Sequence, residues 1–300
     1  MRVGFVGLGR MGAAIAGRVA DAGFDLTVWN RTPGRTGDLL DRGAQEAGVL
    51  GEVCPGRDVA ITMVADDDAL REVALGPDGI AQTLGPGGVH VAMGTHGVTA
   101  IAQVADAHAQ AGQSLVAAPV LGRPDVAAAG GLGIVAAGPA AAVERVRPLL
   151  DAIGRHTFEA GERPESATAI KLANNFVLGC AIEALAEAFA LGRRYDVDPA
   201  ILYEVLTEGL FSAPAFKVYG QIIVDEDYDR VGFTTTLALK DIELTMAAAS
   251  AAAVPLPSGS ALRDRLLAAI AQGDGERDWA VLGREQARAS GLEQPKSSKA

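Results

Sequence analysis

Short apolar runs alternate with stretches of helical period along the first half of the chain. The apolar runs are typical of buried strands, which are predicted over residues 2–6, 24–29, 58–64, 88–93, 114–120, 132–137 and 156–159. The clearest helices are predicted over 13–21, 98–111 and 140–153. Strands that alternate with helices indicate one doubly wound parallel sheet with helices on both faces. The fold class expected for this half is therefore α/β.

The pattern changes near residue 163, after which the apolar positions follow a helical period and no clear strand is visible. Asp198 and Pro199 mark a helix start, because Asp caps helices and Pro suits their first position. We therefore predict an α/β domain over 1–163 and an all-α domain over 164–300. The polar tail after Gly291 is expected to be frayed.

The longest apolar run lies within a predicted helix over residues 165–194, which would be about 45 Å long. Such a helix overruns a small domain, so we expect it to join the two halves and to contribute to a homodimer built on the helical domain. Polar side chains interrupt the run at Lys171, Asn174, Asn175, Glu183 and Glu187. These groups would be costly in a bilayer, so we expect a buried helix and no membrane partner.

Composition narrows the classes of partner and compartment. The chain has 300 residues and a formal net charge of −11, which argues against a nucleic-acid partner. Cys54 and Cys180 are far apart and lack metal-ligand spacing, and no signal peptide precedes the first strand. We therefore expect a cytoplasmic protein without a metal site.

A glycine motif directly follows the first predicted strand. The segment Gly7-Leu8-Gly9-Arg10-Met11-Gly12 has the spacing GxGxxG and opens a helix. The first glycine of such a motif makes a tight turn, the second admits a pyrophosphate, and the third packs helix on strand. The helix N-terminus then favours phosphate groups. The motif predicts dinucleotide binding, and a glycine-rich turn without ligand is the alternative.

The end of the second strand bears on the choice of dinucleotide. Selection of NAD usually needs an acid there to hold the ribose 2′-hydroxyl, but this chain has Asn30-Arg31-Thr32. Asn30 can bond the ribose, Arg31 and Thr32 can bond a 2′-phosphate, and Arg35 adds positive charge. We predict NADPH in preference to NADH. The alternative is that Arg31 is a solvated surface arginine.

Loops at the carboxyl ends of parallel strands are the usual ligand sites. The loops after Val64, Met93 and Val120 are therefore candidates. Thr95 and His96 follow the fourth strand directly, and we favour a place for both in the site. A loop histidine with a structural hydrogen bond is the alternative for His96.

The helical half carries the candidate acid–base chemistry. Lys171 and Asn175 are four residues apart and share one helix face, with Asn174 beside them. Apolar surroundings disfavour a charged lysine and bring its proton into catalytic range. The alternative is a lysine whose stem covers the core. A second helical segment, FTTTLALKD, contains Phe233, Lys240 and Asp241.

Together these motifs resemble the β-hydroxyacid dehydrogenase family, which includes 3-hydroxyisobutyrate dehydrogenases and glyoxylate/succinic semialdehyde reductases. The resemblance covers about residues 2–290 and rests on GLGRMG at Gly7, WNRT at Trp29, APV at Ala118, KLANN at Lys171 and FTTTLALKD at Phe233. It implies a Rossmann domain followed by an all-helical domain, assembled as dimers or tetramers.

The resemblance also implies roles for single residues. Lys171 corresponds to the catalytic lysine and Asn175 to the asparagine that orients the substrate, with Asn174 beside it in the substrate site. Thr95 corresponds to the threonine beside the nicotinamide. Phe233, Lys240 and Asp241 match the residues that close over coenzyme and substrate, and Val64 lies in a coenzyme loop.

The chain departs from the family where substrate is held. The family pattern DAPVSGG reads AAPVLGR here, so Leu121 replaces the serine and Arg123 the second glycine around Gly122. Arg123 can supply a charged fork for a carboxylate. Alternatively, Arg123 points to solvent or an interface, and Leu121 lines an apolar pocket for a larger, less acidic substrate.

The sequence therefore predicts an NADPH-dependent dehydrogenase or reductase of a small carbonyl or hydroxyacid-like substrate, with Lys171 as general acid and base. An imine reductase is the first alternative. Such enzymes commonly lack the lysine, so Lys171 argues against a dedicated one. A dinucleotide-binding scaffold without catalysis is less favoured for the same reason.

Overall fold

The computed structural model describes residues 1–292 and divides into two compact units, Met1–Lys171 and the part from Leu172 onward. The division falls inside helix α7 (Pro164–Arg194). The change of composition near residue 163 thus marks the start of this helix, whereas the first unit extends through its first two turns. The tail beyond residue 292, which was expected to be frayed, lies outside the described residues.

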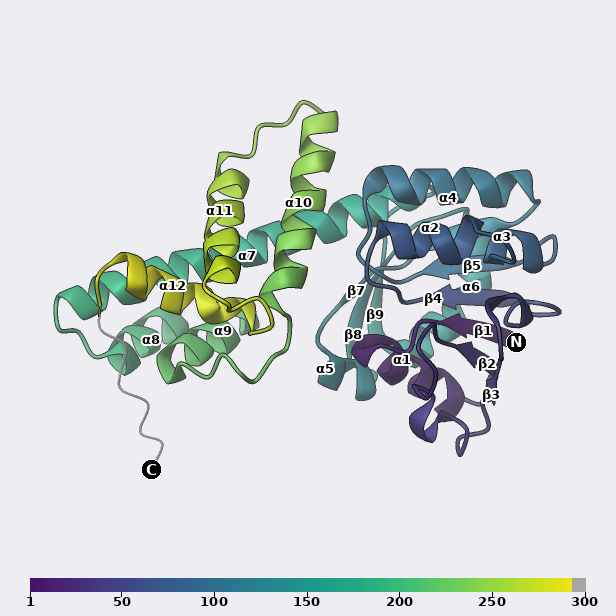
Figure 1. The fold of residues 1–300 in the computed structure, drawn as a ribbon, viewed down its shortest axis with the longest axis horizontal. Coiled ribbons are helices and arrows are strands. Elements are labelled where there is room, and N and C mark those ends of the chain that lie inside the picture. The colour runs from purple at the N-terminus through teal and green to yellow at the C-terminus, as the bar shows by residue number, and fades with distance from the viewer. Residues whose placement is uncertain (293–300) are drawn as a thin grey trace. The chain divides into compact units, whose positions relative to one another are not determined.

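The first unit is built on a six-stranded parallel sheet of order β3-β2-β1-β4-β5-β6 (Figure 1). Its strands are β1 (Arg2–Val6), β2 (Asp25–Trp29), β3 (Gln45–Glu46), β4 (Val59–Thr62), β5 (Val89–Ala92) and β6 (Ser114–Ala117). The strand order reverses between β1 and β4, as in dinucleotide-binding folds. The predicted α/β class with a Rossmann-type sheet is confirmed.

Helices cover both faces of this sheet. They are α1 (Arg10–Asp21), α2 (Asp67–Leu75), α3 (Ile80–Thr83), α4 (Val98–Gln110), α5 (Pro124–Ala128) and α6 (Ala140–Ile153), with 3-10 turns at Gly37–Leu39 and Leu50–Glu52. Figure 1 shows α2, α3 and α4 together on one side of the unit. On the other face, α1 packs against α5 and α6.

The later strands do not extend the main sheet, so that part of the prediction is wrong. Strands β7 (Val120–Leu121), β8 (Leu132–Ala136) and β9 (Gly154–Glu159) form a second sheet, in which β7 is antiparallel to β8. The strand predicted over 114–120 breaks after Ala117, because Pro119 cannot donate to a strand ladder. The Pro119 carbonyl instead accepts from Val135 N at 3.0 Å, in the second sheet.

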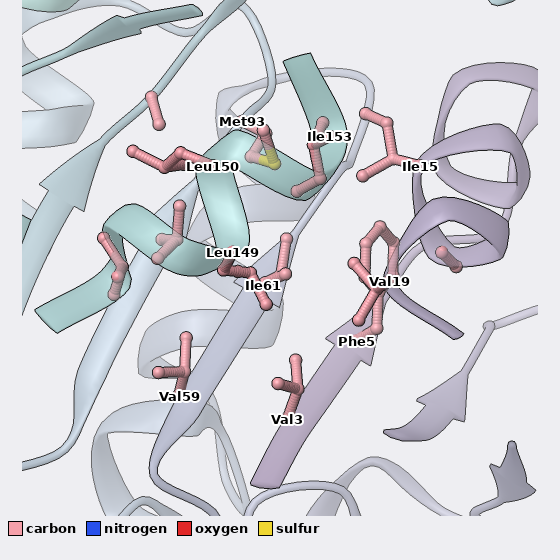
Figure 2. Packing of buried hydrophobic residues seen from close by; sticks show 14 of the residues in the cluster. Val3, Phe5, Ile15, Val19, Val59, Ile61, Met93, Leu149, Leu150 and Ile153 are labelled. Atoms are coloured by element: carbon pink, nitrogen blue, oxygen red, sulfur yellow. The ribbon is translucent and has the colours of Figure 1, made fainter. Parts of the chain in front are cut away.

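The core of the first unit fixes β1 and β4 beneath the helices α1 and α6. Figure 2 shows Val3 and Phe5 on β1, Val59 and Ile61 on β4, and Leu149 on α6 directed into this core. These side chains are fully or almost fully buried. Burial of one such side chain stabilises the fold by about 1.5–3 kcal/mol. The carboxyl ends of the strands are thus firmly held beneath their loops.

In the described part of the second unit the regular elements are helices, joined by turns. After α7 come α8 (Pro199–Glu208), α9 (Pro214–Asp225), α10 (Thr235–Ala251), α11 (Pro257–Ala271) and α12 (Leu282–Ala289), with a 3-10 turn at Trp279–Val281. The predicted helix start at Pro199 is present, with Asp198 Oδ1 accepting from Ala200 N at 2.9 Å. The prediction of an all-α second half is therefore confirmed for the described residues.

Within residues 1–292, α7 is the one helix whose length and apolar composition would suffice to cross a membrane. The core helix of a soluble protein passes the same test, so a single helix of this kind is weak evidence for a membrane protein.

A row of buried hydrogen bonds links β4, β5 and α4. Thr62 Oγ1 lies 2.9 Å from His90 Nε2, His90 Nδ1 lies 2.8 Å from His108 Nε2, and His108 Nδ1 lies 2.6 Å from Gln113 Oε1. The Gln113 amide donates to the carbonyl of Leu84, which leaves its oxygen as the acceptor. In their neutral form, both imidazoles therefore carry their proton on Nδ1.

Burial lowers the pKa of both histidines, most strongly that of His90, which also lies close to His108 and His96. Unfolded histidines titrate near pH 6.5. Below that pH the unfolded chain binds protons that the folded chain excludes. Stability is therefore complete above about pH 6.5 and is lost as the pH falls, by at most about 1.4 kcal/mol per histidine per pH unit.

Denaturant unfolding at pH 7.5 and pH 5.5 measures this loss. A variant of the exposed His156, His156→Gln, should lose as much stability as the parent. Imidazole NMR signals of His90 and His108 should remain those of neutral rings as the pH falls through 6.5. A titration of either ring near pH 6.5 would contradict the interpretation.

Candidate coenzyme and substrate site

The glycine motif forms a tight turn between β1 and α1. Gly7 has φ +100°, and a Cβ on it would lie 2.4 Å from the Met63 carbonyl oxygen. A Cβ on Gly12 would lie 1.9 Å from the Gly7 carbonyl oxygen. A Cβ on Gly9 would meet nothing within 4 Å, which leaves this backbone open to a ligand. The N-cap residue Gly9 has no side-chain cap, so the first N–H groups of α1 fit a pyrophosphate.

Asn30 braces this turn from the end of β2. Its Oδ1 accepts from Leu8 N at 2.8 Å, and its Nδ2 donates to the Thr32 carbonyl at 2.8 Å. The amide that was expected to bond a ribose therefore holds the glycine turn in register with β2. The sequence alone did not indicate this hydrogen bond.

Arg31, which follows the end of β2, is an exposed arginine. Its side chain is 78% exposed, and Nη1 lies 3.8 Å from Glu72 Oε2, a solvated pair of the kind that contributes little. Thr32 and Arg35 are exposed as well. These side chains can therefore turn towards an anion at low cost. Val64, in the loop after β4, is packed close to Gly7.

His96, which follows Thr95 after β5, contacts the start of α2. Its buried ring places Nδ1 3.4 Å from Asp67 Oδ1, and the same oxygen accepts from Gly97 N at 2.9 Å. Burial alone would raise the pKa of Asp67, but the hydrogen bonds from His96 and Gly97 hold it below the ordinary value. The ring covers Gly94, where a Cβ would lie 2.4 Å from His96 Nε2.

This arrangement supports the structural interpretation of His96, as a link between the loops after β4 and β5. Sequence reasoning missed Asp67. It lies in the run Asp66-Asp67-Asp68, which reads as helix-capping residues, and Asp66 does cap α2. Gly94 was a usable signal, since a glycine two residues before a histidine can admit its ring.

The segment after β7 directs Arg123 through a left-handed turn. Gly122 has φ +144°, and a Cβ there would lie 2.7 Å from Leu132 Cδ2, so the turn needs glycine. Leu121 and Arg123 are both half-buried. Within the part of the chain that the structure describes, Arg123 Nε is buried without a hydrogen-bond acceptor. A buried donor without a partner costs about 1–3 kcal/mol.

The second unit holds a buried polar cluster. Asn175 Nδ2 donates to Asp241 Oδ2 at 2.6 Å, and Lys240 Nζ pairs with Asp241 Oδ1 at 3.0 Å. Asn174 Nδ2 donates to Asn175 Oδ1 at 3.2 Å. Asp241 is only 1% exposed, so its charge needs these partners. The cluster fixes the Asn175 amide from a residue 66 positions away.

Lys171 and Phe233 are the remaining site residues that the sequence predicts in the helical half of the chain. Lys171 is half-buried and lies one helical turn before Asn175 on α7. Phe233 lies just before α10 and packs edge-on against Trp279, with ring centroids 5.3 Å apart. Its backbone N–H donates to Asp278 Oδ2 at 3.2 Å, which fixes the turn that carries it.

Neither metal nor thiol chemistry finds support among residues 1–292. No three His, Cys, Asp or Glu side chains of this part gather as a metal site requires. Burial raises the pKa of the Cys54 thiol to about 11, so it stays protonated and unreactive at neutral pH.

Two family models together match most of the chain. The NAD binding domain of 6-phosphogluconate dehydrogenase matches residues 2–161, and the NAD-binding domain of NADP-dependent 3-hydroxyisobutyrate dehydrogenase matches residues 166–284. The fold, the glycine turn and these matches define an oxidoreductase that uses a nicotinamide dinucleotide. The chain belongs to the β-hydroxyacid dehydrogenase family, as its motifs predict.

Known relatives match this chain over nearly its full length and over nearly their own. An uncharacterized oxidoreductase of Bacillus subtilis, YfjR, is 39% identical over 94% of this chain and 98% of its own. A 3-hydroxyisobutyrate dehydrogenase of Pseudomonas aeruginosa is 32% identical over 92% and 94%. The solved 3-hydroxyisobutyrate dehydrogenase of Salmonella typhimurium is 28% identical, with a TM-score of 0.84 over 95% and 99%. An imine reductase of Myxococcus stipitatus, 20% identical over 95% and 99% with a TM-score of 0.64, shares the fold alone.

Two glycine variants separate folding from coenzyme binding. Gly9→Ala adds a methyl group in open space, so thermal stability should be nearly unchanged, while the methyl should weaken coenzyme binding at least about tenfold. Gly12→Ala drives a methyl into the Gly7 carbonyl and should cost about 3 kcal/mol or more of stability. Thermal unfolding and titration with NADP⁺ and NAD⁺ measure both effects. Unchanged coenzyme affinity in Gly9→Ala would place the pyrophosphate elsewhere.

Proposed function

We propose that this protein is an NADPH-dependent dehydrogenase or reductase of a small hydroxyacid-type substrate, with Lys171 as its general acid and base. The observation that carries the proposal is the position of Lys171 on α7, half-buried and one turn before Asn175. The Asn175 amide is held by the buried carboxylate of Asp241 at 2.6 Å. A proton donor beside a fixed amide is what reduction of a carbonyl needs.

The chemistry divides between coenzyme and side chains. The nicotinamide, when bound, exchanges hydride with the carbon that bears the substrate oxygen. During reduction the Lys171 ammonium donates a proton to that oxygen as negative charge develops there. During oxidation the neutral Lys171 amine accepts the proton. Asn175 is pre-oriented by Asn174 and Asp241, so its carboxamide can position the substrate oxygen or Lys171 without reorganisation.

The edge beside β2 supports a preference for NADPH. The strand end carries no acid that would repel a 2′-phosphate, and Arg31 is exposed with only a long, solvated partner. A guanidinium in this position can form paired, charge-assisted hydrogen bonds to phosphate oxygens. Because Asn30 serves the glycine turn, Arg31 and Thr32 are the residues we assign to the 2′-phosphate.

Arg123 supports a substrate with a carboxylate. Of the two interpretations that the sequence leaves open, a buried Nε without an acceptor among the described residues favours anion binding over a solvated arginine. We therefore propose that Arg123 holds the carboxylate and that Leu121 lines the adjacent apolar wall. The Arg123 guanidinium would then bind the carboxylate in place of the serine hydroxyl of the family pattern.

Exposed apolar side chains on the second unit support a homodimer. Leu191 and Tyr195 near the end of α7, Ile201 and Val205 on α8, and Leu210 after it are all exposed. Exposed large apolar side chains of this kind are typical of protein–protein interfaces when they form one surface. We propose that a second copy of the chain covers them.

Replacement of Arg31 tests the coenzyme preference. Arg31→Ala should weaken NADPH binding by about 1.5–3 kcal/mol, the contribution of a charged hydrogen bond, and leave NADH binding nearly unchanged. Arg230→Ala, which removes an exposed arginine of the second unit, serves as the control. Equal losses for both coenzymes, or a parent enzyme that prefers NADH, would refute the assignment.

Lys171→Met tests the proton donor and keeps the packing of the side-chain stem. Turnover of the best carbonyl substrate should fall about 10²–10⁴-fold, while NADPH affinity should change little. Lys217→Met removes a surface lysine paired with Glu208 and should retain full activity. A panel of aldehydes, keto acids and cyclic imines identifies the substrate class.

Each other outcome of this experiment has a definite meaning. Near-normal turnover in Lys171→Met would assign the proton to another group. Surviving imine reduction with lost carbonyl reduction would favour an imine reductase, because an iminium needs no proton donor at the hydride step. Tight NADPH binding without turnover on any substrate would indicate a scaffold.

A further inference from the structure

A small cavity opens at the amino ends of β1, β4 and β5. All strands of the main sheet are parallel, so this edge lies opposite the glycine turn and its neighbouring loops. The cavity has a volume of about 240 Å³. It is lined by Arg2, Arg57, Asp58 and Arg145 together with the glycine-rich turns at residues 56 and 85–88. Neither the coenzyme nor the proposed catalytic residues involve this edge.

Two guanidinium groups of this cavity share one carboxylate. Arg2 Nη2 lies 3.4 Å and Arg145 Nη2 lies 3.8 Å from Asp58 Oδ1. The other oxygen of Asp58 accepts from Arg2 N at 2.9 Å, so the carboxylate is anchored to the backbone. Arg2 and its neighbours hold the pKa of Asp58 below its ordinary value. Both ion pairs are long, at 3.4 and 3.8 Å. Arg145 Nη1 also donates to the Gly87 carbonyl, which fixes this guanidinium at the cavity.

The third guanidinium, that of Arg57, is more buried than those of Arg2 and Arg145. Its side chain is 15% exposed, with Nη1 3.0 Å from Asp25 Oδ1 and Nη2 donating to Thr27 Oγ1. Its Nε is buried without an acceptor in the described part of the chain. The three arginines thus face two carboxylates, which leaves a local positive charge. This excess occurs in a chain whose net charge is −11.

The chemistry of the lining defines the ligand class. Guanidinium groups present planar pairs of N–H donors that match the oxygens of phosphate and carboxylate. The cavity is smaller than the roughly 300–1,000 Å³ of sites for drug-sized ligands, so it suits one small oxyanion. We propose that this cavity is a second anion site, which binds free phosphate or the phosphate group of a small ester.

Calorimetric titration of the coenzyme-saturated protein tests the site. Saturation with NADP⁺ and, in parallel, NAD⁺ occupies the glycine turn, so added phosphate cannot bind there. Inorganic phosphate, at constant ionic strength in chloride buffer, should bind saturably with one site per chain. Glycerol 3-phosphate distinguishes the two proposed ligands. If it binds more tightly than phosphate, the ligand is a phosphate ester; if it binds more weakly, the ligand is free phosphate. Malonate, a dicarboxylate, should bind more weakly than either.

Variants assign the binding to this cavity. Arg145→Ala should weaken phosphate binding at least tenfold, and Arg145→Lys should restore only part of the affinity, because it keeps charge without the planar fork. Arg2→Gln gives a second variant, since the backbone hydrogen bond from residue 2 to Asp58 does not depend on the side chain. Arg263→Ala, at a guanidinium of α11 paired with Glu243, should bind like the parent.

Two results would overturn the proposal. One is the absence of saturable phosphate binding by the coenzyme-saturated parent protein. The other is undiminished binding by Arg145→Ala and Arg2→Gln, provided that circular dichroism shows both variants folded.

Discussion

The approach of Gly12 to the Gly7 carbonyl is the contact on which the rest of the coenzyme site depends. A single methyl group at residue 12 would lie 1.9 Å from that oxygen, so α1 can meet the end of β1 only through glycine. The same turn brings Gly7 against the Met63 carbonyl and thereby ties β1 to the loop after β4. Asn30 then fixes the turn to β2. Three neighbouring strands thus converge on one backbone turn at the start of α1.

The local sequence pattern was sufficient to predict the glycine turn, the parallel strands and the helical second half. Each of these features depends on residues that are close together in the chain. Partnerships over long distances were not predictable in this way. The Asn175–Asp241 bond joins residues 66 positions apart, and the second sheet depends on where Pro119 ends a strand. Asn30 shows the limit most clearly. Its predicted hydrogen bond to a ribose stays a prediction, while its hydrogen bond from the backbone N–H of Leu8 could not be predicted from local pattern. The roles assigned to Lys171, Thr95 and Arg123 remain predictions.

Buried polar groups of this protein fall into two kinds. Some form closed sets: every ring nitrogen of His90 and His108 has a hydrogen-bond partner. Such sets stabilise and orient the fold without a ligand. The Nε atoms of Arg57 and Arg123, in contrast, are buried without an acceptor among the described residues. Since buried donors are rarely left unpaired, these two arginines are where we propose that anions bind.

The hydrogen bond between His90 and His108 also affects whether these histidines can bind transition-metal ions. Neighbouring imidazoles are the commonest metal ligands in proteins, and they bind through an unprotonated nitrogen. Here both unprotonated nitrogens already accept hydrogen bonds, one from Thr62 and one from His90 itself. Zinc or nickel would have to break both bonds and enter a region closed to solvent. The fold therefore contains a histidine pair that metal ions cannot readily capture.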